Sequence, residues 1–97
     1  MNANGRRGRQ RLNNHHVPQY SVSIRFGIPN YTHRNAPAIA LPESEHLCVT
    51  AAQYIRDTTG WSARQVLDDD IRLLRQHTDV PENAIRHLIQ LFAAFLP

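Results

Sequence analysis

The stretch Ser62-Ala63-Arg64-Gln65, directly after Gly60-Trp61, constrains the fold of this chain most strongly. A serine followed three residues later by glutamine is a capping box, in which each side chain accepts a hydrogen bond from the other residue's backbone N–H and so starts a helix. Trp61 and Val66 flank the box as a hydrophobic staple. Apolar residues then recur at helical spacing, namely Ala63, Val66, Leu67, Ile71, Leu73 and Leu74. The pattern predicts a helix over residues 63–77.

An earlier helix is predicted over residues 43–59. Pro42 followed by Glu43 and Glu45 is typical of a helix start, because proline fits the first turn and acids favour the positive end of the helix dipole. Gly60 is suited to cap its C-terminal end. Its apolar face at helical spacing comprises Leu47, Cys48, Ala51, Tyr54 and Ile55. An alternative stays open, because residues 50–53 also form a capping box; residues 46–49 would then be a strand and the helix shorter.

A third capping box, Asp79-Val80-Pro81-Glu82, predicts a last helix over residues 80–96. Its apolar stripe is broad and comprises Ile85, Leu88, Ile89, Phe92, Phe95 and Leu96. Because the final turn is strongly apolar, we expect it to pack against another element or to form an interface.

The sequence before residue 42 lacks the helical spacing of the later segments and predicts an arm, a strand and a loop. Residues 19–26 alternate between apolar and polar side chains, which predicts a half-buried strand with Ser21, Ser23 and Arg25 on its polar face. A loop over residues 27–41 follows, in which residues 36–41 could form a second extended piece. Residues 1–18 have few apolar side chains and predict a flexible basic arm. The predicted fold class is mainly α with a minor β part: this arm, then a single small domain over residues 19–97 with one or two short strands and a three-helix C-terminal bundle.

The charge of the chain is divided unevenly along its 97 residues. Residues 1–42 hold six arginines and no acid, whereas residues 43–97 hold five arginines and eight acids, for a net charge of +3. Since the chain has no lysine, every fixed cation is a guanidinium, which suits bidentate contact with phosphate. This pattern favours a nucleic acid as the partner of the first part of the chain.

The sequence has no motif that indicates catalysis. It lacks a glycine-rich phosphate loop, a nucleophile elbow and a paired-cysteine metal motif, so we expect neither enzymatic activity nor a cofactor or metal site. The single cysteine, Cys48, favours a reducing compartment, and no apolar run is long enough for a membrane span. We therefore expect an intracellular protein, cytoplasmic or nucleoid-associated, that does not act at a membrane.

The run Asp68-Asp69-Asp70 sets three carboxylates on one predicted helix. Asp68 is placed to pair with Arg72 at i+4, and Asp69 lies on the polar face. Asp70 is surrounded by apolar positions at three- and four-residue spacing, where an unpaired carboxylate would be costly. We expect Asp70 to lie at the edge of an interface between helices and to pair with an arginine from another helix; the alternative is an acid held for catalysis.

Residues 36–76 resemble the ribbon–helix–helix DNA-binding family. The matching residues are Leu41-Pro42-Glu43, Gly60-Trp61-Ser62, Val66, Leu67, Ile71 and Leu74. The resemblance implies an intertwined dimer whose paired strands lie in the major groove. It also implies that the backbone N–H groups of Ser62, Ala63 and Arg64 hold a phosphate. Since the strand before Leu41 would present alanines outward, the polar face of residues 19–26 is the alternative reading ribbon.

Two functional hypotheses follow. The first is a nucleic-acid-binding protein of the DNA-binding transcriptional regulator type, with DNA favoured over RNA and with a homodimer as a possible form. Its predicted contacts are Arg6, Arg7, Arg9, Arg11, Ser21, Ser23, Arg25, Ser62 and Arg64. The second is a small protein–protein interaction module, such as an assembly subunit or a phage or viral inhibitor, with the predicted interface Trp61, Leu88, Phe92 and Phe95.

Overall fold

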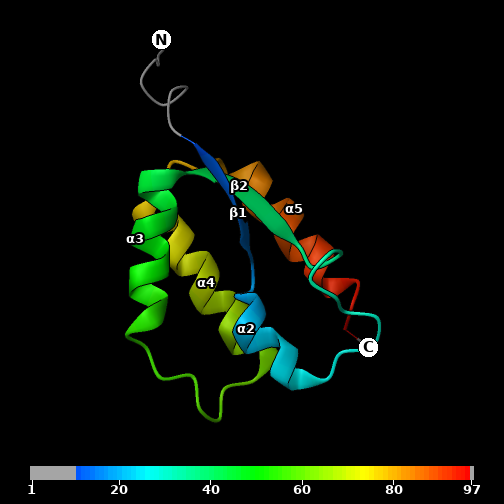
Figure 1. The fold of residues 1–97 in the computed structure, drawn as a ribbon. Coiled ribbons are helices and arrows are strands. Elements are labelled where there is room, and N and C mark those ends of the chain that lie inside the picture. Colours follow the sequence, from blue (N-terminus) through cyan, green and yellow to red (C-terminus); the bar gives the residue numbers. More distant parts are fainter. Residues whose placement is uncertain (1–10, 97) are drawn as a thin grey trace.

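The computed structural model describes residues 11–96. The described residues form a mainly α-helical fold with a minor β part, as predicted (Figure 1). Its elements in chain order are β1 (Leu12–His16), α2 (Tyr20–Ser23), the 3-10 helix η1 (Ile24–Phe26), β2 (Ala38–Pro42), α3 (Glu43–Tyr54), α4 (Ala63–His77) and α5 (Glu82–Ala93). Among these residues, no helix has the length and apolar character that a membrane crossing requires.

The first strand, β1, lies where the sequence pattern predicted no strand. β1 pairs with β2 in antiparallel register, from Leu12 opposite Pro42 to His16 opposite Ala38. The prediction of a flexible arm is therefore wrong for residues 12–16, while residues 1–10 of that arm lie outside the described residues. β1 is ordered by hydrogen bonds to β2, a contact distant in sequence that local composition does not reveal.

The predicted strand over residues 19–26 is wrong, because this segment is helical in α2 and η1. The carbonyl of Gln19 accepts hydrogen bonds from the backbone N–H groups of Val22 and Ser23, which closes a helical turn. Burial does not follow the alternation either, since Ser23 is buried and Ile24 is exposed. The second extended piece, predicted at residues 36–41, is present as β2.

Helix α3 begins at Glu43 as predicted but ends at Tyr54, five residues before the predicted end. Its C-terminal cap is Ile55, and Gly60 lies instead in the turn before α4, with a positive φ of 82°. The alternative of a strand at residues 46–49 is wrong, because these residues lie inside the helix. The shorter helix frees residues 55–61 to form a connection that positions Arg56 and Thr58.

Helix α4 spans Ala63–His77 and confirms the predicted bounds. The capping box is formed as expected: Ser62 Oγ accepts from the Gln65 N–H at 3.1 Å and Gln65 Oε1 accepts from the Ser62 N–H at 2.7 Å. Helix α5 begins at Glu82 after Pro81 and ends at Ala93. Its N-cap is Pro81, so the prediction of a cap at Asp79 is wrong.

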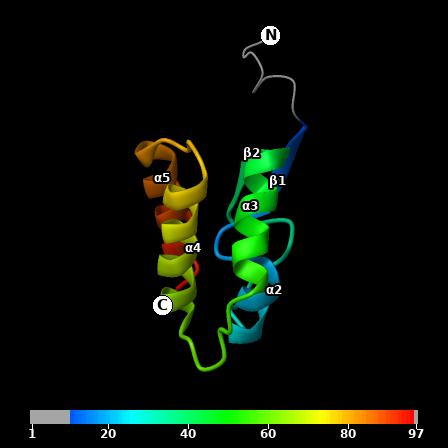
Figure 2. The same cartoon turned by 90° about the vertical axis from the view of Figure 1, so that its left-hand side faces the viewer.

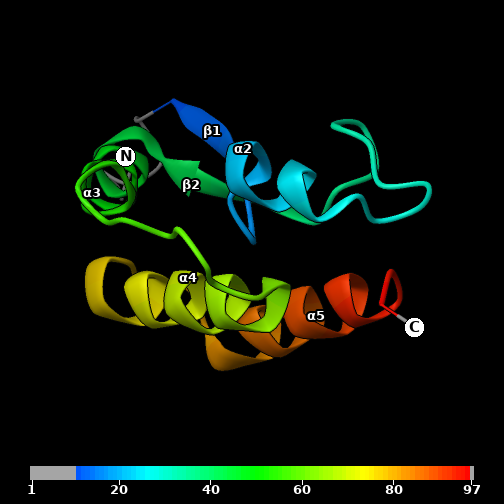
Figure 3. The same ribbon diagram turned by 90° about the horizontal axis from the view of Figure 1, so that it is seen from below.

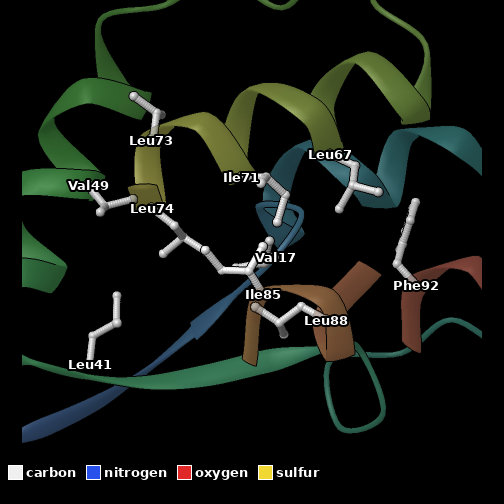
Figure 4. Packing of buried hydrophobic residues seen from close by; sticks show 10 residues of the cluster. All are labelled: Val17, Leu41, Val49, Leu67, Ile71, Leu73, Leu74, Ile85, Leu88 and Phe92. Atoms are coloured by element: carbon white, nitrogen blue, oxygen red, sulfur yellow. The ribbon is translucent and has the colours of Figure 1, made fainter. Parts of the chain in front are cut away.

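The elements form two layers. Helices α4 and α5 run side by side in one layer, and β1, β2, α2 and α3 form the other (Figures 2 and 3). The core lies between the layers and is built by both (Figure 4). Its buried apolar side chains are Val17, Leu41, Val49, Leu67, Ile71, Leu73, Leu74, Ile85, Leu88 and Phe92. Because α3 belongs to the layer that holds the strands, one side of α3 faces the core and the other faces away from the rest of the chain.

Candidate functional site

Asp70 is the centre of a buried polar network between the two layers. Its side chain is only 1% exposed, and Oδ1 accepts hydrogen bonds from Arg56 Nη2 at 2.7 Å and from Gln53 Nε2 at 3.0 Å. Oδ2 accepts from the backbone N–H of Gln19 at 2.6 Å. The expected pairing with an arginine is confirmed, but Arg56 lies in the connection after α3 and not in a helix. The expected place of Asp70 at the edge of an interface is wrong, because its side chain is buried between the layers. The network therefore ties α4 to α3 and to the segment before α2.

Arg56 extends the network to the protein surface. Its Nη1 donates to Asp69 Oδ2 at 2.7 Å, and its guanidinium lies 5.6 Å from the centre of the Trp61 ring, a cation–π distance. Asp69 also accepts from Arg72 Nε at 2.9 Å. Burial alone would raise the pKa of the Asp69 carboxyl, but the hydrogen bonds from Arg72 and Arg56 outweigh burial and lower it. Arg72 thus pairs with Asp69, and the predicted pairing with Asp68 is wrong.

Burial and hydrogen bonding change the pKa of the Asp70 carboxyl in opposite directions. Burial has the largest effect and raises the pKa of this group above its ordinary value, while Arg56 and the hydrogen bonds from Gln19 and Gln53 act to lower it. Burial of a carboxylate is tolerated only where such partners compensate for lost hydration. Since both oxygens are already bonded to the protein and the side chain is buried, this arrangement serves to join the layers.

Gln53 connects Asp70 to His15 in β1. The amide Nε2 of Gln53 lies 3.2 Å from His15 Nε2 and also donates to Asp70. An amide N–H can bond this ring nitrogen only if the nitrogen is an acceptor, so the contact requires a neutral imidazole. The pKa of His15 is lowered to about 4, chiefly by burial and further by the nearby His46, His16 and Arg56. His15 is therefore uncharged at neutral pH.

A pocket of about 220 Å³ lies beside His15, between β1, α2 and α3. It is lined by Asn14, His15, His16, Gln19, Tyr20, His46, Thr50 and Gln53. The rings of His15 and His46 meet edge to face at 5.1 Å, and those of Tyr20 and Tyr31 stack at 5.8 Å. Within residues 11–96, no group of three or more His, Cys, Asp or Glu side chains is arranged to hold a metal ion. The imidazoles here pack against each other and against neighbouring rings.

The residues predicted to contact nucleic acid are dispersed. Arg6, Arg7 and Arg9 lie outside the described residues, and Arg11 is exposed just before β1. Ser21 is exposed but Ser23 is buried, and both lie in α2, not on one face of a strand. Arg25 donates to the side-chain oxygen of Thr58 at 2.9 Å and so holds the connection between α3 and α4. Residues 21, 23 and 25 therefore do not form the predicted reading ribbon.

The corner at Gly60-Trp61-Ser62 is also engaged within the chain. The N–H of Ser62 donates to Gln65, so the capping box occupies one of the donors that the family resemblance assigns to a phosphate. Arg64 pairs with Asp68 at 2.9 Å. The depression beside the corner, of about 430 Å³, is lined by Trp61, Gln65, Asp68, Asp69 and Arg72. The charged side chains that line this depression, Asp68, Asp69 and Arg72, are all ion-paired within the chain, so the depression offers no unpaired cation to an anion.

The predicted protein interface is largely part of the core. Leu88 and Phe92 are buried between the layers, and Phe95 is half-buried with its ring 5.0 Å from that of Tyr31. The apolar stripe of α5 thus packs against the chain itself because α4 and the segment around Tyr31 cover it. Trp61 is half-buried and remains accessible at the corner before α4.

The apolar face that the sequence predicts for the first helix lies on the outer side of α3, and its exposure is what sequence reasoning missed. Leu47, Cys48, Ala51, Tyr54 and Ile55 share this face and all five are exposed. Tyr54 is 88% exposed, Ile55 84% and Leu47 59%. The inner face instead carries Val49, Ala52 and Gln53, and the polar Gln53 is buried because Asp70 and His15 bond its amide. The helix therefore presents its more apolar side outward, and only the distant bonding partners of Gln53 could have indicated this.

Comparison of the chain with protein-family models, curated proteins and solved structures finds no match. The ribbon–helix–helix resemblance therefore stays a prediction. In this chain, β2, which leads into Leu41-Pro42-Glu43, pairs along one edge with β1 of the same chain. Pairing with a second copy, as the resemblance implies, would need the other edge of β2.

Proposed function

We propose that this protein binds nucleic acid through the arginines that precede β1. The main support for the proposal is the position of the net positive charge along the chain. Residues 11–96 contain eight arginines and eight acids, so the net charge of +3 belongs to residues 1–10, with Arg6, Arg7 and Arg9. A basic segment attached to an electrically balanced domain is the arrangement expected for nonspecific attraction to a polyanion.

The ion pairs of the folded domain support this division of roles. Arg56, Arg64, Arg72 and Arg75 each pair with an aspartate or glutamate of the same chain. Arginines already neutralised by carboxylates contribute little to phosphate binding. The arginine-rich segment joins the domain at Arg11, whose carbonyl accepts from the N–H of Glu43 at 2.9 Å. The domain thus holds the end of the segment at the corner where β1 meets α3.

The salt dependence of binding tests the mechanism. Four to six arginine–phosphate contacts on duplex DNA predict a slope of about −4 to −5 for the logarithm of the binding constant against the logarithm of the salt concentration. This slope is measured by fluorescence anisotropy with a labelled duplex and, in parallel, a labelled single-stranded RNA. A slope near zero, or binding that persists at high salt, would contradict phosphate contact as the source of affinity.

Charge reversal locates the contact. The variant R6E/R7E/R9E/R11E should lose detectable binding at physiological salt. A matched comparison uses two double variants with equal charge change: R7E/R9E should weaken binding, whereas R34E/R86E, at two exposed positions of the folded domain, should have a smaller effect. Equal losses from the two double variants would show that net charge alone, and not this segment, controls binding.

A second candidate function is a protein–protein interaction module. The exposed, uncharged face of α3 favours it, because monomeric soluble proteins rarely leave a contiguous apolar face in water. This candidate expects a stable protein complex and no binding of DNA or RNA at physiological salt. The same anisotropy series decides between the two candidates, since the second predicts no signal from either nucleic acid.

A further inference from the structure

The outer face of α3 has the form of an interface. Leu47, Ala51 and Ile55 follow each other at four-residue spacing and form one row along the helix, flanked by Cys48 and Tyr54. Rows at this spacing are the ridges through which helices most often interdigitate in globular proteins. In Figure 3, α3 lies at the end of its layer, and no other described element covers its outer side. The row is therefore open along its length.

The face lacks any charge that could select a charged partner. Its five side chains are uncharged, and the nearest acids, Glu43 and Asp57, lie at or beyond its two ends. Gln53 and His46, two polar side chains of the helix that are buried or half-buried, point to the other side, where they line the pocket beside β1. The chemistry of this face therefore fits an apolar partner surface.

We propose that the occupant of this face is α3 of a second copy of the chain, in antiparallel orientation. The row is symmetric about Ala51, with a large side chain four residues before it and another four residues after it. When two copies cross at Ala51, Leu47 of each copy meets Ile55 of the other, so a single two-fold operation makes both contacts. The small Ala51 side chains at the crossing point allow the two helix backbones to approach closely.

The crossing angle and the area are consistent with a specific dimer. Two such rows interdigitate at a crossing angle of about −50°, at which the helix ends diverge and the acids Glu43 and Asp57 of opposite copies separate. Covering the face in both copies buries on the order of 1,000 Å², the lower limit for a specific interface. An interface at this lower size limit is typical of a weak, transient complex, so we expect a dimer with a dissociation constant in the micromolar range.

The inference goes beyond nucleic-acid binding and does not depend on it. A dimer would carry two arginine-rich segments, so that binding of one segment to a polyanion raises the local concentration of the other. R6E/R7E/R9E/R11E should leave the dimer intact, and a monomeric variant should retain the contacts of a single segment. Failure of one proposal is thus distinguishable from failure of the other.

Sedimentation equilibrium of the full chain is the first test. The native chain should sediment at twice its mass of 11.1 kDa. The variant A51E sets two carboxylates against each other at the crossing point and should raise the dissociation constant by about 100-fold or more. Because Ala51 is exposed and glutamate favours helix, A51E should keep the native circular dichroism spectrum. Its unfolding midpoint should equal that of the native chain when both are measured at a concentration too low for the native chain to dimerise. The control Q90E, on the exposed side of α5, should dimerise normally.

Cross-linking tests the register. In a C48S background, A51C should form a disulfide-linked dimer on mild oxidation, because position 51 meets itself on the two-fold axis; T50C, one residue away, should not. A native chain that is monomeric at about 100 μM overturns the proposal, as does an A51E variant that dimerises like the native chain. Equal cross-linking through positions 50 and 51 overturns the antiparallel register.

Discussion

Replacement of Asp68, Asp69 and Asp70 in turn by asparagine tests how the buried network holds the two layers together. The three carboxylates are consecutive on α4, yet their side chains are 62%, 19% and 1% exposed. Each substitution removes one charge and keeps the shape of the side chain. The chain therefore contains its own matched series, in which burial and pairing vary while the chemistry of the change stays the same.

The expected losses of unfolding free energy follow the burial of each ion pair. Asp68 forms an exposed pair with Arg64, so D68N should cost about 0.5 kcal/mol or less. Asp69 is partly buried and holds Arg56 and Arg72, so D69N should cost about 1 kcal/mol. D70N leaves the buried Arg56 without its innermost partner and should cost about 3–5 kcal/mol. That loss is a large part of the roughly 5–15 kcal/mol that stabilises a small domain.

Urea denaturation provides the assay, with Trp61 as its probe. Trp61 is the chain's only tryptophan and lies against Arg56, so its fluorescence reports on this corner. In thermal unfolding followed by the same fluorescence, the melting temperatures of D68N and D70N should differ by at least about 12 °C. A D70N variant within about 0.5 kcal/mol of the native protein would refute the reasoning, because the Arg56 pair would then contribute nothing to stability. Equal costs across the series would refute it as well.

Two further predictions concern β1 and the start of α4. The pKa of His15 is about 4 in the folded chain and 6.5 in the unfolded chain, so the unfolded state binds the proton first as the pH falls. The free energy of unfolding should therefore not change above pH 6.5 and should fall by about 3 kcal/mol as the pH drops towards 4. Urea midpoints measured between pH 7 and 4.5 should therefore fall less in H15Q, and an equal fall in both proteins would exclude His15 as the cause. Replacement S62A should cost about 1 kcal/mol by removing the side-chain cap of α4, whereas S21A at an exposed position should cost almost nothing; similar losses would argue against the capping box.

The sequence by itself determined the features that depend on neighbours along the chain. The bounds of α4 follow from Ser62, Gln65 and the apolar spacing after them, because a capping box and a helical period are complete within one segment. The mainly α class and the separation of charge are of the same kind. Asp70 also belongs here, since an acid among apolar positions required a cationic partner, although the sequence did not identify Arg56.

Only the tertiary structure decided which segment became a strand and which side of α3 turned inward. β1 is extended because β2, far along the chain, supplies its hydrogen bonds, while the alternating segment at residues 20–26 folded as helix. In α3, the apolar side was exposed and Gln53 was buried, because His15 and Asp70, from two other elements, bond the Gln53 amide. Contacts between groups that only folding brings together cannot be predicted from a local sequence pattern. In α3, the buried hydrogen bonds of Gln53 decided which side faces inward, against the side that the apolar spacing indicated.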